Sequence, residues 1–318
     1  MKVSSPPHPA RSSPPSPTKG EVRFLLFPVR CIMNFALWKK SFSESKWLLV
    51  CSLALMFAVH WLRVWIASFF STSALESMFG FMPEMVEQLM PVSFAQVATV
   101  AGRIAAEYDD PVVLLLMTVW SISRGSDAVS GELNRGTMEM LLGQPVTRLG
   151  VLVSQAGVTL GGAALLGLAA WLGTCTGLAT VTLEQPTSAD VFVPAALNLF
   201  ALGAFLAGLT TMISAASDYR SRTIGIVGGF YAISMIVKIV GRLVPGWKWV
   251  TYVSFFTAFE PQLLVASTTR AWSFWVQQTG GGYELGGLAY DSTLIGLGLA
   301  CYLAAAIVFC RRDLPAPL

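Results

Sequence analysis

The sequence has 318 residues, of which 54 % are hydrophobic and only 12 % are charged. A soluble domain carries about 25 % charged residues, so a soluble fold of this size could not cover its surface, and we predict an integral membrane protein. The net charge of +3 is too small to indicate a nucleic-acid partner. His8 and His60 are the two histidines, too few for a histidine-based catalytic zinc site, and the five cysteines show no metal-type spacing.

Residues 1–19 are rich in Pro and Ser with almost nothing apolar, so they cannot bury enough surface to fold, and we predict a disordered tail over residues 1–32. Met33 begins a stretch that would also serve as a protein start, so the tail is either an upstream extension or part of the translated chain. Phe35, Trp38 and Phe42 fall on one helical face beside lysines. This pattern predicts an interfacial helix on the inner leaflet; the alternative is a positively charged flank of the first span.

A helix that spans a membrane needs about 20 mostly apolar residues, and six stretches meet this requirement. In chain order they are residues 47–70, 111–129, 150–173, 191–217, 223–243 and 292–310. We therefore predict an all-α integral membrane protein with six transmembrane helices in one domain over residues 33–318, together with the N-terminal interfacial helix. Basic residues are in excess in the segments on one side of these spans, so this side is expected to be cytoplasmic, with both termini inside.

Two loops on the predicted outer side are long, at residues 71–110 and 244–291. The second is rich in Trp, Tyr and Phe, which favour the membrane–water interface. We expect short helices in these outer loops, lying in or dipping into the outer leaflet, because non-helical backbone at that depth would have to be buried in protein.

The spans contain few groups that could do chemistry. The sequence has no Gly-Lys dipeptide, which excludes a phosphate-binding P-loop, and the third, fourth and sixth spans contain no ionisable Asp, Glu, Lys, Arg or His. His60 and Arg63 lie one helical turn apart in the first span, and Lys238 lies in the fifth. The His60–Arg63 pair either anchors the outer end of its span or lines a substrate path.

The most informative segment is the predicted cytoplasmic loop at residues 124–149. Gly136 permits a turn, Thr137 can cap a following helix, and Pro145 ends that helix. A helix of about seven residues is not stable alone, since isolated helices need about 12–15 residues. The helix must therefore pack against another surface.

Three apolar residues share one face of this short helix: Met138, Leu141 and Leu142. Charged side chains surround that face: Glu132, Arg135, Glu139 and Arg148. An apolar surface with a charged rim suits a groove on a cytoplasmic partner. The alternative is a loop packed against its own spans.

The sequence from Gly131 to Arg148 resembles the coupling segment of ABC-transporter permeases of the type-2 exporter class, in the pattern Gly-Glu-x-x-Arg-Gly-Thr-Met-Glu-Met-Leu-Leu-x-x-Pro-Val-x-Arg. Residues 33–40, 255–261 and 311–317 are similar to the multicopper-enzyme-maturation branch of that class. The resemblance covers about residues 33–318. The long 71–110 loop and Arg124 do not match it.

The resemblance implies a permease in the cytoplasmic (inner) membrane of a prokaryote, working as a homodimer or with a second permease. Separate cytoplasmic ATPase subunits would bind and hydrolyse ATP, so this chain would be no enzyme and would hold no cofactor. The coupling contact would be formed or framed by Glu132, Arg135, Gly136, Thr137, Met138, Glu139, Leu141, Leu142, Pro145 and Arg148. A secondary transporter or channel, or a membrane scaffold that anchors a cytoplasmic protein, remains the alternative.

The sequence does not name a substrate. The first outer loop has a methionine group beside two glutamates: Met78, Met82, Met85 and Met90 with Glu84 and Glu87. Thioethers suit cuprous copper, and the resembled branch carries a copper association. The alternative is that these methionines fill gaps in apolar packing.

Overall fold

The computed structural model describes residues 35–83, 86, 90–144, 146–244, 246–277 and 283–312. The predicted tail at residues 1–32 lies outside the described residues, as do Pro145 and the side chains of Glu139 and Leu142. Within the described ranges, six helical stretches are long and apolar enough to cross a membrane. Their main helices are α1 (Phe35–Ala67), α6 (Pro111–Ser126), α9 (Arg148–Thr180), α10 (Val193–Ala216), α11 (Arg220–Leu243) and α15 (Gly287–Arg311). The predicted all-α membrane fold is confirmed.

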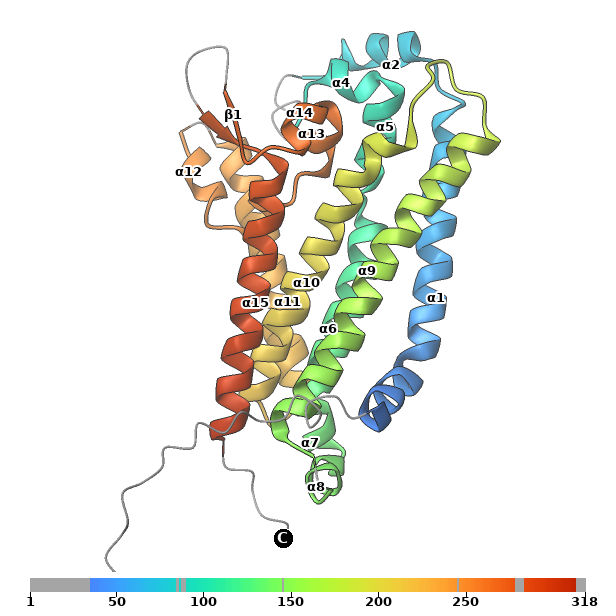
Figure 1. Cartoon of the computed structure of the whole chain (residues 1–318). Helices are drawn as coiled ribbons and strands as arrows, with labels where there is room; N and C mark the ends of the chain where they lie inside the picture. The colour runs from blue at the N-terminus through green and yellow to red at the C-terminus, as the bar shows by residue number, and fades with distance from the viewer. Residues whose placement is uncertain are drawn as a thin grey trace, which may run out of the picture.

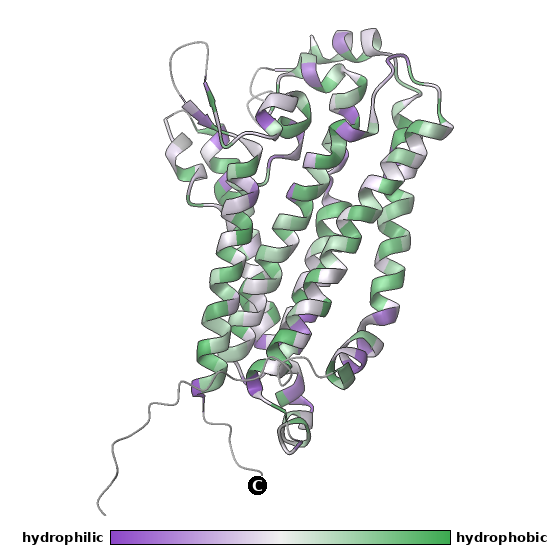
Figure 2. Ribbon diagram, viewed as in Figure 1, coloured by the Kyte–Doolittle hydropathy of each residue, from purple (hydrophilic) through white to green (hydrophobic). Residues whose placement is uncertain are grey.

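The six long helices form one bundle (Figure 1). Helix α1 packs against α9, α10 packs against α15, and α6 contacts α9 and α10. Figure 2 shows that the middle of the bundle is hydrophobic and that hydrophilic residues gather towards its ends. The end that carries α7 (Glu132–Asn134) and α8 (Thr137–Leu142), at the bottom of Figure 1, corresponds to the predicted cytoplasmic side and is here called the inner end.

Close backbone contact explains the pairing of α10 with α15. A Cβ added at Gly208 of α10 would lie 2.4 Å from the carbonyl oxygen of Gly298 on α15, and a Cβ at Gly298 would lie 3.0 Å from the carbonyl oxygen of Ala204. Helices in a membrane associate through such small residues, because lipid offers no hydrophobic drive for their association.

A helix is present where the interfacial helix was predicted, but it forms the first turns of α1 rather than a separate element. Helix α1 is continuous over 33 residues, and its first turns bend away from the rest (Figure 1). The sequence between Phe42 and Trp47 contains neither Gly nor Pro, so nothing stops the helix there.

The opposite, outer end contains short helices, as predicted for the two long loops. They are α2 (Thr72–Phe79), α4 (Phe94–Ala98), α5 (Val100–Glu107), α12 (Lys248–Thr251), η4 (Phe255–Ala258), α13 (Pro261–Ala266) and α14 (Thr268–Ala271). A further turn, η3 (Ala189–Phe192), precedes α10. One feature was not expected: strands β1 (Trp275–Gln277) and β2 (Tyr283–Leu285) pair antiparallel, with Val276 opposite Glu284.

Candidate coupling segment and outer cavities

The coupling segment begins where α6 changes its hydrogen-bond pattern. Helix α6 continues into a π-helical stretch, η2 (Asp127–Gly131), which leads to α7. The hydroxyl of Ser214 on α10 accepts hydrogen bonds from the backbone N–H groups of Ser130 (2.9 Å) and Val129 (3.3 Å). Such π-helical turns are rare, and a neighbouring helix supplies the acceptor that holds this one.

A left-handed residue separates α7 from α8. Gly136 has φ 70°, a conformation that Gly adopts without the steric cost other residues meet. The Thr137 hydroxyl donates to the carboxylate of Glu132, which fixes the start of α8 against α7. The turn at Gly136 and the short helix from Thr137 are where the sequence predicts them.

Two residues of the apolar face of α8, Met138 and Leu141, are turned inward, which corrects the expectation that they fill a partner's groove. Met138 is 1 % and Leu141 is 9 % exposed. Met138 belongs to a cluster with Val129, Leu152 and Phe309, and Leu141 clusters with Leu37 and Val151. An apolar sequence pattern indicates that a helix face is buried, but it does not identify the surface that buries it. Here the starts of α1 and α9 and the end of α15 cover Met138 and Leu141.

The solvent-exposed surface of α8 and of the turns beside it is formed by other residues. Met140 is 74 % exposed, and the Arg135 side chain is 41 % exposed. Asn134, Gly136, Gly143 and Gln144 are exposed beside them. A contact with a cytoplasmic partner would therefore centre on Met140 and Arg135, with Met138 and Leu141 supporting the helix from behind.

Two carboxylates connect the coupling segment to several helices. Glu132 is 1 % exposed, and its carboxylate lies 2.9 Å from Lys40 Nζ on α1 and 3.4 Å from Arg135. Asp127 lies 2.8 Å from Arg135 and 3.4 Å from Arg220 on α11. Partial burial alone would lower the pKa of Arg135, but its pairing with Asp127 and Glu132 outweighs this and raises that pKa.

Arg124, which matched no expected pattern, lies at the centre of this end of the bundle. It is 2 % exposed, and its guanidinium donates at 2.7 Å to the Ser41 hydroxyl and at 2.7 Å to the Gln155 side-chain oxygen. It also lies 3.6 Å from Asp127. A single Arg at the end of an apolar span has to be paired with polar or charged groups. Its presence in the sequence was therefore the signal that polar partners surround it.

Arg148 does not belong to an exposed rim. Its guanidinium donates to the carbonyl oxygens of Phe309 (3.2 Å) and Arg312 (2.6 Å) at the end of α15. Cations stabilise the carbonyl end of a helix, so Arg148 ties the start of α9 to α15.

His60 and Arg63 turn to different partners near the outer end. His60 is fully buried, its Nδ1 lies 3.0 Å from the carbonyl oxygen of Met56, and its ring meets the edge of Tyr108 at 4.7 Å between centroids. Arg63 forms an ion pair with Asp110 at the start of α6. The pair is therefore tied to α6 and to the turn before it, and the two cavities described next are lined by other residues.

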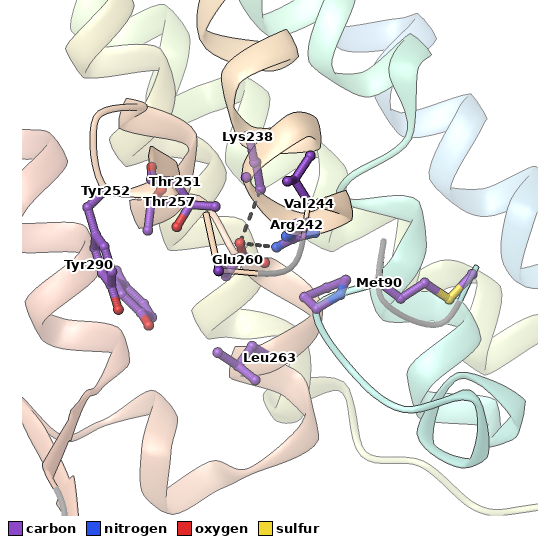
Figure 3. A pocket seen from close by; sticks show the side chains of 13 residues that line it. Met90, Lys238, Arg242, Val244, Thr251, Tyr252, Thr257, Glu260, Leu263 and Tyr290 are labelled. Carbon is purple, nitrogen blue, oxygen red and sulfur yellow. Dashed lines mark hydrogen bonds and ion pairs between the residues drawn. The ribbon is translucent and has the colours of Figure 1, made fainter. Parts of the chain in front are cut away.

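The larger of these cavities has a volume of about 640 Å³ and lies at the outer end of α11; because three charged side chains line it, it is here called the polar cavity. Figure 3 shows Lys238, Arg242 and Glu260 pointing towards one another inside it. Lys238 Nζ lies 3.1 Å from Glu260 Oε1 and donates at 3.0 Å to the carbonyl oxygen of Phe259, while Arg242 pairs with the same carboxylate. Buried Asn198 of α10 accepts a hydrogen bond from the Glu260 backbone N–H at 3.1 Å, which fixes the position of Glu260.

A second cavity, of about 370 Å³, adjoins the first and shares Tyr252, Thr257 and Tyr290 with it. Its other walls are mainly apolar, and they include Phe205, Phe230, Phe255, Leu294 and Leu297. Sequence reasoning named Lys238 as an ionisable residue of the fifth span but found neither cavity, because their walls come from the fourth, fifth and sixth spans and both outer loops.

The residues of the copper hypothesis lie in different surroundings or outside the described residues, so this hypothesis stays a prediction. The described residues contain no group of three or more His, Cys, Asp or Glu side chains placed to hold a metal ion. Met78 is 49 % and Met82 38 % exposed, Met90 lines the polar cavity, and Met85, Glu84 and Glu87 lie outside the described residues.

Comparison with known proteins gives the family. None of the curated proteins compared with the chain matches it. The family model described as ABC-2 family transporter protein matches residues 38–314, which covers all six spans and the coupling segment. This match does not single out the multicopper-enzyme-maturation branch, which stays a prediction. The chain belongs to the ABC-2 transporter family.

Proposed function

We propose that this chain is the permease of an ATP-driven exporter, energised by separate cytoplasmic ATPase subunits through residues 131–148. Family membership makes it the membrane component of an ABC transporter. The absence of a Gly-Lys dipeptide from the sequence supports ATP hydrolysis in another subunit. The export direction, the prokaryotic cytoplasmic membrane and the position of both termini inside are part of the same proposal.

The observation that carries the proposal is the way the coupling segment is tied to the bundle. Force on α7 and α8 would reach α1 through Glu132 and Lys40, α11 through Asp127 and Arg220, and α10 through the π-helical turn. A short helix with an exposed outer face and a firmly packed inner face can transmit a partner's movement rather than absorb it.

Pairing with a second permease, identical or not, is also proposed. Helix α11 has only 22 % of its most apolar stretch buried within this chain. A Cβ added at Gly225 or Gly229 of α11 would meet nothing within 4 Å. Small residues spaced by four on an uncovered membrane helix favour close approach of another helix.

The test is Met140→Asp, with Met78→Asp as the matched control. Met140 is 74 % and Met78 49 % exposed, and they lie at opposite ends of the bundle, so both variants should fold and insert. A carboxylate at position 140 would be desolvated against the ATPase, at a cost of several kcal/mol. We expect Met140→Asp to lower both co-purification of the ATPase and ATP hydrolysis in membranes by about tenfold or more, and Met78→Asp to change neither.

Unchanged ATPase binding and hydrolysis in an inserted Met140→Asp variant would remove this segment from the coupling contact. Transport that follows a proton gradient without ATP would instead identify a secondary transporter. A bound cytoplasmic partner without any ATPase activity would favour a scaffold.

A further inference from the structure

The polar cavity at the outer end of α11 contains a carboxylate that is only half satisfied. Glu260 is 7 % exposed. Its Oε1 forms ion pairs with both Lys238 and Arg242, whereas its buried Oε2 has no hydrogen-bond partner among the described residues. A buried carboxylate oxygen without a donor is costly, and the Glu260 side chain that carries it lines a cavity of about 640 Å³. This carboxylate can accept hydrogen bonds from a ligand group that donates, such as an ammonium or a hydroxyl.

The charges around this oxygen balance one another. Lys238 and Arg242 supply two positive charges, Glu260 supplies one negative charge, and the Asp109 carboxylate lies within electrostatic range of all three. A purely anionic ligand would compete with Glu260, and a purely cationic ligand would be repelled by Lys238 and Arg242. A ligand that carries both charges can place an anion on the two cations and a donor on the Glu260 carboxylate.

The adjoining cavity offers space for an apolar part of the same ligand. The two cavities share Tyr252, Thr257 and Tyr290, so these side chains stand between them. Figure 3 shows the rings of Tyr252 and Tyr290 together at one side of the polar cavity, where they can contact an ammonium group. The walls beyond them are mainly apolar, with Phe230 of α11 and Leu297 of α15 among them.

We propose that this double cavity binds a phospholipid, with its zwitterionic phosphate–ammonium headgroup in the polar cavity and an acyl chain in the apolar one. The phosphate lies between Lys238 and Arg242, and the ammonium donates to the Glu260 carboxylate. The assignment deepens the proposed exporter function, on which it rests, by naming a phospholipid-like amphiphile as the class of cargo. The exposed Trp247 and Trp249 nearby favour the depth in the membrane at which headgroups lie.

The binding experiment uses the purified full chain in detergent without its ATPase, so its outcome is independent of the coupling test above. The probes are dihexanoyl phosphatidylethanolamine, dihexanoyl phosphatidic acid and free phosphoethanolamine, with dissociation constants measured by tryptophan fluorescence. We expect the first to bind tightest and phosphoethanolamine to bind about tenfold or more weaker. Equal binding of phosphoethanolamine and the lipid would overturn the lipid assignment in favour of a soluble zwitterion.

Glu260→Gln tests the headgroup, with Glu76→Gln on exposed α2 as its matched control. Without the carboxylate, the cavity gains net positive charge. We therefore expect the preference to reverse towards phosphatidic acid, a change that a merely misfolded site would not produce. An unchanged preference would overturn the headgroup assignment.

Leu297→Trp tests the acyl chain, with Leu303→Trp on the same helix as its control. Leu297 lines the apolar cavity and is 45 % exposed, and Leu303 is 66 % exposed. The larger ring at position 297 fills the space for the chain, so phosphatidylethanolamine should bind about tenfold or more weaker, while Leu303→Trp leaves its affinity unchanged. Equal affinity in both variants would overturn the placement of the chain.

Discussion

At the scale of single residues, the centre of the bundle depends on the fit between Trp120 of α6 and Gly162 of α9. Trp120 is fully buried, and its Nε1 donates to the carbonyl oxygen of Thr159 at 2.9 Å. A Cβ at position 162 would lie 2.0 Å from Cζ2 of the Trp120 ring, far inside van der Waals contact. Only Gly at this position lets the two helices pack at their present spacing.

Replacing Gly162 by Ala should therefore force the Trp120 ring out of place and destabilise the bundle by about 1–3 kcal/mol. The neighbouring Gly161 is a matched control, because a Cβ there would meet nothing within 4 Å. Gly161→Ala should be neutral or gain up to about 1 kcal/mol from better helix propensity. Thermal unfolding in detergent micelles, followed by near-UV circular dichroism, compares the two, and equal melting temperatures would contradict this account.

The polar residues of the inner end could be read only in part from the sequence. The sequence shows that Arg124 is a charged residue at the end of a span and must be paired there. Its partners Ser41 and Gln155, however, lie 83 and 31 positions away along the chain. Neither partner carries a charge that would identify it. In the same way Lys238 was visible, whereas its carboxylate partner Glu260 lies in the last outer loop.

At the scale of elements, hydropathy predicted the six spans because length and apolar composition alone decide whether a helix crosses a membrane. The π-helical turn η2 could not be predicted, since it depends on the Ser214 hydroxyl of α10, 84 positions beyond Ser130. The β1–β2 hairpin did have a signal, because Gly280, Gly281 and Gly282 lie between its strands as glycines do in hairpin connections. The aromatic content of this loop led instead to an expectation of helices alone.

Ser214→Ala should loosen η2 without unfolding the bundle. It removes the acceptor of the Ser130 and Val129 amides and the donor to the Ser126 carbonyl oxygen, at a cost of about 1–3 kcal/mol for groups left unsatisfied. Thr210→Val is the matched control, because the Thr210 hydroxyl donates only within its own helix, to Leu206.

Amide hydrogen exchange measures the effect of Ser214→Ala. Exchange over residues 127–134 should become faster by about tenfold, which corresponds to 1.4 kcal/mol, while the rest of α6 is unchanged. Equally fast exchange in the Thr210→Val variant would show that the Ser214 hydroxyl is not what holds the π-helical turn.

At the scale of the whole molecule, the proposed orientation gives a direct test. Ser188, in the connection between α9 and α10, and Ser221, near the start of α11, are both exposed. This connection and the start of α11 lie at opposite ends of the bundle (Figure 1). In a cysteine-free background, a single cysteine at position 188 should react with a membrane-impermeant maleimide in intact cells. A cysteine at position 221 should react only after permeabilisation, and external labelling there would reject the orientation.

The anchoring of Arg148 has a consequence for the order in which the protein is made. Its carbonyl partners Phe309 and Arg312 follow it by 161 and 164 positions, and Phe309 also covers Met138 in the cluster behind α8. During synthesis, five spans are therefore complete before the support beneath the coupling helix exists. We expect a nascent or truncated chain that lacks α15 to present this helix without its packed inner face, so the proposed engagement of the ATPase would wait until the sixth span has been inserted.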